Sequence, residues 1–494
     1  MRLWVKHANQ QTVTFSDYSG GLNTESTIEG IGENQLAMVE NMEVDHATGK
    51  LRTISGTEAY IRKANLFAVM YDEINRKILL VTQDKKVYIE NEEIGTLSGE
   101  LYPIYTSWEN GILIASGGKL QYYNGTELKT IENSPESSSV YIRSGRVLVT
   151  SGNEIRYSGI GDEENWTDNT NDYSSSKFIE VGYKEGGNFL GLVNLSQYIL
   201  IVKDNRRLYR LSGEFPEWTV QEISRNVECN DRLGICAVSD AVYILGNDEM
   251  EGLAENEFSG NVKPANVGIL VKSELKKLSK STKIRYVPPA NQIFLIDGTE
   301  KILVYDLVFK SWYARKYNEK VIDVIVIDDE VYLLRENELS KENETIFTDV
   351  GKAMTWRFRG RRLVSQHAFL LKKTQVAFIP LNAQVYSGEV RVGAVKVVFP
   401  IPRRQLELHN NRSQLWRNRT QISNTGRGRG TYFSELPMYE NQRMLHGNRD
   451  GIFSRRTIIK ENRNVFRSKY LDVTGEGKQG GVIIEEINIE IAEV

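Results

Sequence analysis

Short runs of β-forming residues, separated by turn signals, fill most of this chain. Gly, Asn and Asp punctuate the runs, as strands joined by tight turns require. Long helical periodicity is nearly absent, and the best candidate for a short helix is residues 33–41. The pattern therefore predicts an all-β fold. Expected strands include residues 66–71, 77–82, 86–89, 111–115, 119–123, 146–150, 198–203, 241–245, 292–296, 301–305 and 330–334.

Tryptophan recurs along these strands at a regular interval. Trp108, Trp166, Trp218 and Trp312 are separated by 58, 52 and 94 residues, so a unit near residue 265 is expected to lack its Trp. A period near 50 residues with about four strands per unit is typical of β-propeller blades. We predict a propeller of six or seven blades, with the Trp rings in blade cores. A series of β-sandwiches or a β-solenoid would have the same strand density.

The distribution of charge indicates a domain boundary near residue 350. Residues 351–494 carry 25 Lys and Arg against 12 Asp and Glu, a net charge of +13. The preceding 350 residues carry 37 against 53, a net charge of −16. We expect an N-terminal arm with first strands at 1–60, which packs on the propeller or threads to a neighbouring subunit. Blades would follow at 61–350, and a basic β region at 351–494, with a long Arg-rich loop at 403–449. Its final strand, 481–491, would close a sheet or the ring by pairing with residues 3–5 or 12–15.

The basic region is rich in arginine, which pairs bidentately with carboxylate or phosphate. Phosphate contact would give a salt-dependent, sequence-independent affinity for DNA. The arginines could instead dock to acidic surfaces, including the acidic body of a neighbouring subunit, and we favour this interpretation over DNA contact. Alternation places Arg357, Arg359 and Arg361 on one face of a strand. The candidates for partner or DNA contact are Arg357, Arg359, Arg361, Arg362, Arg403, Arg404, Arg412, Arg417, Arg419, Arg427 and Arg429.

No motif of catalytic or metal-binding spacing stands out, so we predict no enzyme, cofactor or metal site. The five histidines are scattered, and a nucleophile elbow and a P-loop are missing. Adjacent acidic pairs such as Glu92-Glu93 do not predict the fixed separation that glycosidases need. Two cysteines, Cys229 and Cys236, do not make a disulfide framework. Without an apolar run of signal-peptide or membrane-helix length, folding in a reducing cytoplasm with no membrane span is expected.

The N-terminal segment carries an ordered set of glycines and asparagines. Gly20-Gly21-Leu22-Asn23 is followed by Asn34-Gln35, by Glu40-Asn41-Met42 and by Gly56. Over about 45 residues this order resembles the opening of tail nozzle (tail tubular protein B-like) and packaged-DNA stabilisation proteins of short-tailed phages. That family has an Arg-x-Gly at the end, where this chain has Ile54-Ser55-Gly56. The departure removes a specific arginine contact but not the backbone turn.

The resemblance implies a propeller-containing structural subunit of a virion tail. It implies a homo-oligomeric ring, usually sixfold, that lies below the portal and adaptor and is assembled in the host cytoplasm. Its partners would be other copies of the chain, the adaptor, other tail proteins and genomic DNA, which it would pass or retain. The alternatives are a carbohydrate- or receptor-binding propeller, in which aromatics such as Tyr122-Tyr123 stack on sugars, and an enzyme built on a propeller.

Overall fold

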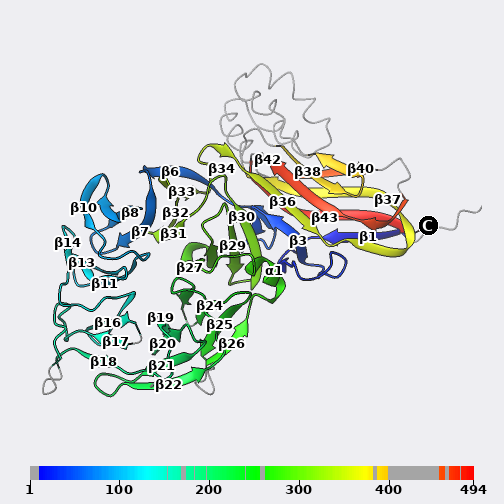
Figure 1. Ribbon diagram of the computed structural model, residues 1–494. Coiled ribbons are helices and arrows are strands. Elements are labelled where there is room, and N and C mark those ends of the chain that lie inside the picture. The colour runs from blue at the N-terminus through cyan, green and yellow to red at the C-terminus, as the bar shows by residue number, and fades with distance from the viewer. Residues whose placement is uncertain are drawn as a thin grey trace, which may run out of the picture. The chain divides into compact units, whose positions relative to one another are not determined.

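The chain divides into two compact units, which are described separately below (Figure 1). Glu58–Glu342 form the propeller unit, and Met1–Thr57 with Asn343–Val494 form the two-ended unit. The computed structural model describes residues 10–152, 154–168, 174–182, 184–195, 197–239, 241–255, 262–381, 387–398, 456–461, 467–478 and 480–493. The arginine-rich stretch at 403–449 lies outside the described residues.

The propeller unit contains seven blades, which confirms the predicted propeller. Six blades are antiparallel sheets of four consecutive strands. The first two are β7 (Leu66–Asp72), β8 (Lys77–Thr82), β9 (Lys86–Ile89), β10 (Glu92–Thr96), and β11 (Ile104–Trp108), β12 (Gly111–Ala115), β13 (Gln121–Tyr123), β14 (Leu128–Thr130). The next two are β15 (Ser139–Arg143), β16 (Arg146–Ser151), β17 (Glu154–Tyr157), β18 (Lys177–Ile179), and β19 (Phe189–Leu195), β20 (Tyr198–Lys203), β21 (Leu208–Ser212), β22 (Thr219–Ser224). Blades 5 and 6 are β23 (Ile235–Val238), β24 (Ala241–Leu245), β25 (Met250–Glu255), β26 (Val262–Asn266), and β27 (Lys283–Val287), β28 (Gln292–Ile296), β29 (Lys301–Asp306), β30 (Ser311–Lys316).

The seventh blade closes the ring with a strand from the other end of the sequence. Its sheet has the order β31 (Asp323–Ile327), β32 (Glu330–Leu334), β33 (Glu338–Asn343), β6 (Gly56–Arg62), and it continues into β34 (Thr348–Asp349) and β35 (Lys352–Ala353). The first strands of successive blades pack side by side from β11 to β31, and β31 packs on β7. The predicted ring closure by the final strand is therefore wrong. That strand, β43 (Val482–Glu493), is about twice the length of a blade strand. It pairs with the still longer β37 (Leu363–Pro380).

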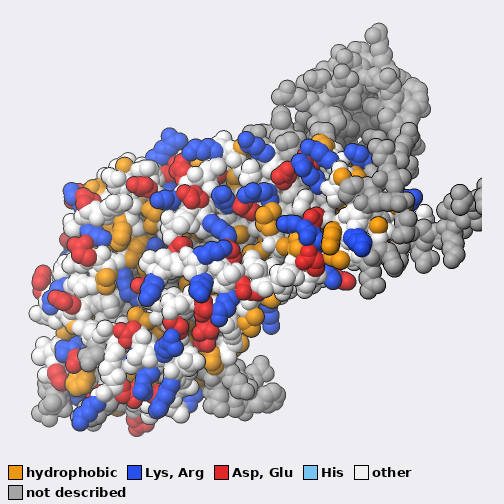
Figure 2. Space-filling model, turned by 45° about the vertical axis from the view of Figure 1, so that its right-hand side comes forward, with side chains coloured by type: hydrophobic (Ala, Val, Ile, Leu, Met, Phe, Trp, Pro, Cys, Tyr) orange, Lys and Arg blue, Asp and Glu red, His pale blue; other side chains and the backbone are white. Residues whose placement is uncertain are grey.

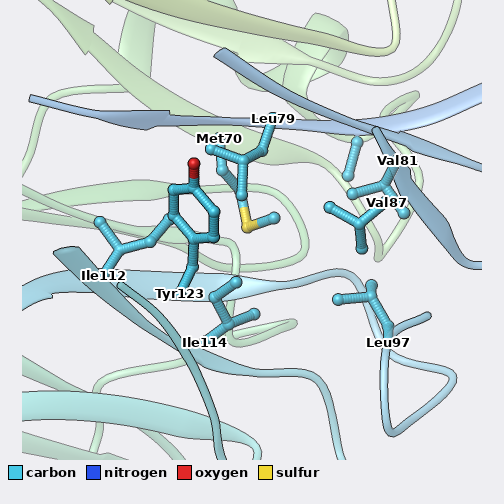
Figure 3. Packing of buried hydrophobic residues seen from close by; sticks show 9 residues of the cluster. Met70, Leu79, Val81, Val87, Leu97, Ile112, Ile114 and Tyr123 are labelled. Atoms are coloured by element: carbon cyan, nitrogen blue, oxygen red, sulfur yellow. The ribbon is translucent and has the colours of Figure 1, made fainter. Parts of the chain in front are cut away.

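Buried apolar side chains fill the spaces between blades. Figure 3 shows one such cluster, in which Met70 and Leu79 of blade 1 face Ile112, Ile114 and Tyr123 of blade 2. All five are fully buried, as alternation along half-buried strands requires. Burying a side chain of this size stabilises the fold by about 1.5–3 kcal/mol. The cluster therefore fixes each blade against its neighbour.

The prediction that the Trp rings lie in blade cores is confirmed for Trp108 and Trp312 only, because Trp166 and Trp218 lie outside the strands and are partly buried against core clusters. Trp108 and Trp312 are buried in blades 2 and 6, and Trp218 packs edge-on against the ring of Tyr157. Blade 5 has no Trp, as the doubled spacing predicted. Trp356 is buried in the two-ended unit and does not continue the repeat.

The two-ended unit contains two sheets that combine both ends of the chain. One has the order β4 (Met42–Val44), β5 (Leu51–Thr53), β43, β37, β40 (Arg456–Glu461), with β1 (Gln10–Phe15) paired to β43 and β41 (Arg467–Leu471) paired to β37. The other has the order β2 (Gly21–Leu22), β3 (Gln35–Glu40), β36 (Thr355–Gly360), β42 (Val473–Lys478), β38 (Ser387–Val392), β39 (Val395–Val398). A short hairpin, β34 (Thr348–Asp349) and β35 (Lys352–Ala353), precedes β36.

Three sequence predictions concern the N-terminal segment. Residues 12–15 do pair with the final strand, from Thr12↔Glu490 to Phe15↔Ile487. Strands β1 to β5 of the segment belong to the sheets of the two-ended unit, and contact of the segment with a neighbouring subunit stays a prediction. The helix predicted at 33–41 is wrong, since this stretch contains strand β3. The described helices are short: η1 (Ile269–Val271), α1 (Lys272–Leu275) and η2 (Pro288–Ala290).

Candidate functional site

The glycine pair of the N-terminal motif makes a tight turn into a short parallel strand. Gly21 has φ of +60°, and its N–H donates to the carbonyl oxygen of Tyr18 at 3.1 Å. A Cβ atom on Gly20 would lie 2.7 Å from Oδ1 of Asn34. Glycine is therefore required at Gly21 by backbone conformation and at Gly20 by close approach. The turn places Leu22, which is buried, beside Leu36 of β3.

The polar residues of the motif hold the loop between β2 and β3. Asn23 is 4% exposed, and its Oδ1 accepts the N–H groups of Glu25 and Ser26, both at 3.1 Å. Its Nδ2 donates to Oε1 of Gln35 at 2.8 Å. Asn34 donates to the hydroxyl of Ser19 at 3.2 Å. Such side-chain bonds replace a backbone ladder in a loop, so the motif has a structural role in this unit.

The last two motif residues join the segment to residues at least 290 positions away in sequence. Asn41 has φ of +56°, and its Nδ2 donates to the carbonyl oxygen of Thr355 at 2.8 Å. Gly56 donates its N–H to the carbonyl oxygen of Ile346 at 2.7 Å. A Cβ atom at Gly56 would lie 2.4 Å from the carbonyl oxygen of Thr348. Gly56 is thus required by backbone proximity at the start of β6, rather than by the turn expected from the sequence.

Strand β36 brings the first predicted arginines next to the motif. It lies between β3 and β42, with Arg357 opposite Glu40 and Arg359 opposite Met38. Residues 356, 358 and 360 are buried while Arg357 and Arg359 are partly exposed, so these two arginines share the outer face as predicted. The strand ends at Gly360, so the prediction that Arg361 shares this face of the strand is wrong, and Arg361 and Arg362 follow directly after it. We call Arg357, Arg359, Arg361, Arg362 and their carboxylate partners the arginine network.

Arg362 has the strongest set of contacts in the arginine network. Its Nε and Nη2 donate to the two carboxylate oxygens of Asp472 at 2.7 and 3.1 Å, and its Nη1 donates to Glu29 at 3.0 Å. Arg359 contacts the same Asp472 carboxylate at 3.4 Å. The hydrogen bonds from Arg362 hold the pKa of Asp472 below its usual range. A planar guanidinium matched to a carboxylate is the geometry that arginine favours.

The other two arginines of the network each form one ion pair that is not bidentate, and their own side chains are more exposed than that of Arg362. Arg357 donates to Glu40 at 2.7 Å, and 42% of its side chain is exposed. Arg361 lies 3.8 Å from Glu33, a carboxylate that is 94% exposed, and donates to the carbonyl oxygen of Glu29 at 3.1 Å. Exposed pairs of this kind contribute little to stability. These guanidinium groups therefore remain accessible to another anion.

The carboxylate partners of the arginine network come largely from a part of the chain that the sequence pattern did not indicate. Glu29, Glu33 and Glu40 all belong to the first 57 residues, which carry 7 acidic and 4 basic residues. A boundary drawn at residue 350 assigned these carboxylates to a different domain from the arginines. Figure 2 shows basic and acidic side chains interspersed on the visible face of the described residues. Contact of the four arginines with DNA or a partner stays a prediction, and Arg403, Arg404, Arg412, Arg417, Arg419, Arg427 and Arg429 lie outside the described residues.

Other kinds of site were also sought in the described part of the chain. There, no group of three or more His, Cys, Asp and Glu residues is placed to hold a metal ion. Both cysteines are free thiols. Among the described helices, none combines the length and apolar character needed to cross a membrane.

Comparisons with known proteins return structural likenesses only. No family model matches the chain, and no curated protein matches it. Solved structures similar to 59% of this chain include BamB from Moraxella catarrhalis (11% identity, 90% of that chain, TM-score 0.37) and the Neurospora crassa Pan2 WD40 domain (11%, 95%, 0.40). A third is the β-propeller domain of Myceliophteria thermophila Cps50 (Swd1), with 8% identity over 98% of that chain and a TM-score of 0.41. The assignment of a propeller rests on the strand order of the seven sheets.

Proposed function

We propose that the protein is a structural subunit of a short-tailed phage tail, in the nozzle or in a head-completion (stopper) ring. It would surround or retain the genome path and dock neighbouring tail proteins. One observation carries the proposal: the residues from Gly20 to Asn41, which resemble the opening of that family, form a hydrogen-bonded element beside β36. A segment of this kind works by shape and contact, without a reaction.

The arginine network suggests how such a subunit would dock. Arg362 is engaged by two carboxylates, so its role is to hold Glu29 and Asp472 together. The side chains of Arg357 and Arg361 are 42% and 35% exposed, so an acidic surface of another subunit could reach them and compete with Glu40 and Glu33. We assign partner contact to these two arginines. DNA phosphate contact is left to the arginines between residues 403 and 429.

The direct test is assembly with the tail partners encoded by the same phage. The full chain is mixed with the portal and adaptor, and the mass of the complex is measured by mass photometry and imaged by cryo-electron microscopy. The proposal expects a ring of this chain, sixfold by the family resemblance. A chain that stays monomeric with all its tail partners present contradicts it. Glycan binding by the isolated chain, with tail assembly unaffected, would instead favour the carbohydrate-binding alternative.

A pair of variants tests the assigned contact. Arg357→Gln with Arg361→Gln removes two exposed positive charges from the arginine network, and we expect slower, less salt-sensitive assembly. The matched control is Arg156→Gln with Arg206→Gln, which removes two half-exposed, ion-paired arginines from the propeller unit. Equal assembly rates for the two double variants would exclude docking through Arg357 and Arg361.

A further inference from the structure

Polar side chains gather at the starts of the innermost strands of the propeller unit. Tyr102 precedes β11, Arg232 precedes β23, and Lys283 and Arg285 lie on β27. Asp323 is the first residue of β31. Because each blade begins with its inner strand, these residues belong to the same end of the ring.

Hydrogen bonds between distant blades place this group on the propeller axis. Arg232, before blade 5, donates to the carbonyl oxygen of Ser138, before blade 3, at 2.9 Å. It also donates to the carbonyl oxygen of Tyr102, before blade 2. The Tyr102 hydroxyl in turn donates to Asp323 of blade 7. In a ring of seven blades, side chains from blades 2, 3, 5 and 7 can meet only around the centre.

Of the three cations in this axial group, Arg285 is the one that forms an ion pair with a carboxylate of the described residues. Arg285 forms a bidentate pair with Asp323, at 3.0 and 2.9 Å. Arg232 has the two carbonyl partners already named, and Lys283 donates to the carbonyl oxygen of Ile322 at 2.7 Å. Among the described residues, neither Arg232 nor Lys283 has a carboxylate within ion-pair distance.

Two further carboxylates, Asp231 and Asp297, act electrostatically on these cations, and both accept main-chain N–H groups. Asp231 accepts the N–H of Leu233 at 2.9 Å, and Asp297 accepts the N–H of Ser279 at 2.7 Å. Burial lowers the pKa of Arg232 to about 10, and burial also lowers the pKa of Lys283. Both shifts mean that the surroundings do not fully replace the hydration of these two cations.

We propose that this axial group is a binding site for an oxyanion, a carboxylate or a phosphate, held between Arg232 and Lys283. Both cations contact the same residue: Arg232 binds the Tyr102 carbonyl oxygen, and Lys283 Nζ lies 4.5 Å from the centre of the Tyr102 ring. An anion there gains charge-assisted hydrogen bonds from two partly buried donors. Arg285 lies two residues after Lys283 on β27, and its charge is neutralised by the ion pair with Asp323.

The test uses the isolated full chain and two probes, inorganic phosphate and acetate. Binding is measured by calorimetry and by the thermal midpoint at constant ionic strength, with chloride as the reference anion. We expect one probe to bind and to raise the midpoint, and the probe that binds more tightly identifies the class of the natural ligand. Absence of any effect beyond that of chloride overturns the proposal.

Variants of Lys283 separate binding from folding. Lys283→Gln should weaken binding about tenfold, whereas Lys283→Arg, which keeps the charge, should restore it. The matched control is Lys276→Gln, which removes an exposed lysine from the connection that leads from blade 5 to β27. Circular dichroism confirms that each variant is folded. If Lys283→Gln and Lys276→Gln bind the probe equally well, the site is not where we place it.

Discussion

The propeller unit and the two-ended unit are both all-β, yet they connect their strands in opposite ways. In six of the seven blades, each strand pairs with the next strand in the sequence. In the two-ended unit, Gln10 pairs with Ala492 and Glu40 with Arg357. Loop-closure entropy grows only slowly with loop length, so distant pairing is compatible with stability. It does slow folding, because non-local contacts form late. The comparison suggests that the blades form first and that the two-ended unit waits for the complete chain.

The largest effect should come from truncating one matched core residue in each unit. Leu334 fills the contact between blades 7 and 1, and Ile489 lies in β43 between β1 and β37; both are fully buried. Leu334→Ala or Ile489→Ala should cost about 2–5 kcal/mol by leaving a cavity. Hydrogen exchange followed by mass spectrometry should show lost protection in the unit that holds the substitution.

An exposed residue of β37 provides the control for these truncations. Val364 is 52% exposed, so Val364→Ala should change stability by less than about 0.5 kcal/mol. If Ile489→Ala loosened the propeller blades while β1 and β37 stayed protected, the division into two units would be wrong.

A glycine under the aromatic rings of β36 should give the next largest effect. A Cβ atom at Gly475 of β42 would lie 2.0 Å from Cε1 of Phe358. Gly475→Ala should therefore cost about 1–3 kcal/mol by overpacking. Gly360→Ala is the matched control on the neighbouring strand, because its nearest atom would be 3.8 Å away. Denaturant midpoints of the two variants measure the difference, and equal midpoints would contradict the packing described for this sheet.

The blades could be predicted from sequence because each one is local. Alternating apolar residues and a turn every few positions define a four-stranded unit without reference to distant residues. Strand β3 could not be predicted in this way. Its buried residues Leu36 and Val39 are three positions apart, which is a helical spacing. A register shift between Leu36 and Met38 lets both side chains point inward from a strand. A bulge of this kind leaves no signal in a single sequence.

Sequence patterns predicted the arginines of the candidate site but not their carboxylate partners. Alternation along the sequence correctly placed Arg357 and Arg359 on the outer face of a strand. Their partners are more than 100 residues away in sequence: Glu40 lies on β3, Asp472 directly precedes β42, and both strands pair with β36. Pairing between distant strands depends on register, which residue patterns do not specify.

A smaller effect should separate the two kinds of pairing within the arginine network. Arg362→Gln removes a bidentate contact and a second ion pair, and we expect a loss of about 1–2 kcal/mol. Arg357→Gln removes one exposed pair and should cost less than about 0.5 kcal/mol. A double-mutant cycle of Arg362→Gln with Asp472→Asn measures the coupling in the denaturant midpoint. A second cycle, of Arg357→Gln with Glu40→Gln, provides the comparison. If the coupling free energy between Arg362 and Asp472 is no larger than that between Arg357 and Glu40, the bidentate geometry adds no stability.

The smallest effect is the pH dependence of the same contact. The pKa of Asp472 is lower in the folded chain than the value near ~3.9 expected when unfolded, mainly because Arg362 donates to its carboxylate. The stabilisation is therefore complete above about pH 4 and is lost as the pH falls through the folded pKa. The difference in thermal midpoint between the wild type and Asp472→Asn should stay constant from about pH 7 to pH 5 and shrink below about pH 4. A difference that already shrinks near pH 6 would show that another group controls this contact, and the bidentate pair would then not account for the stability of the arginine network.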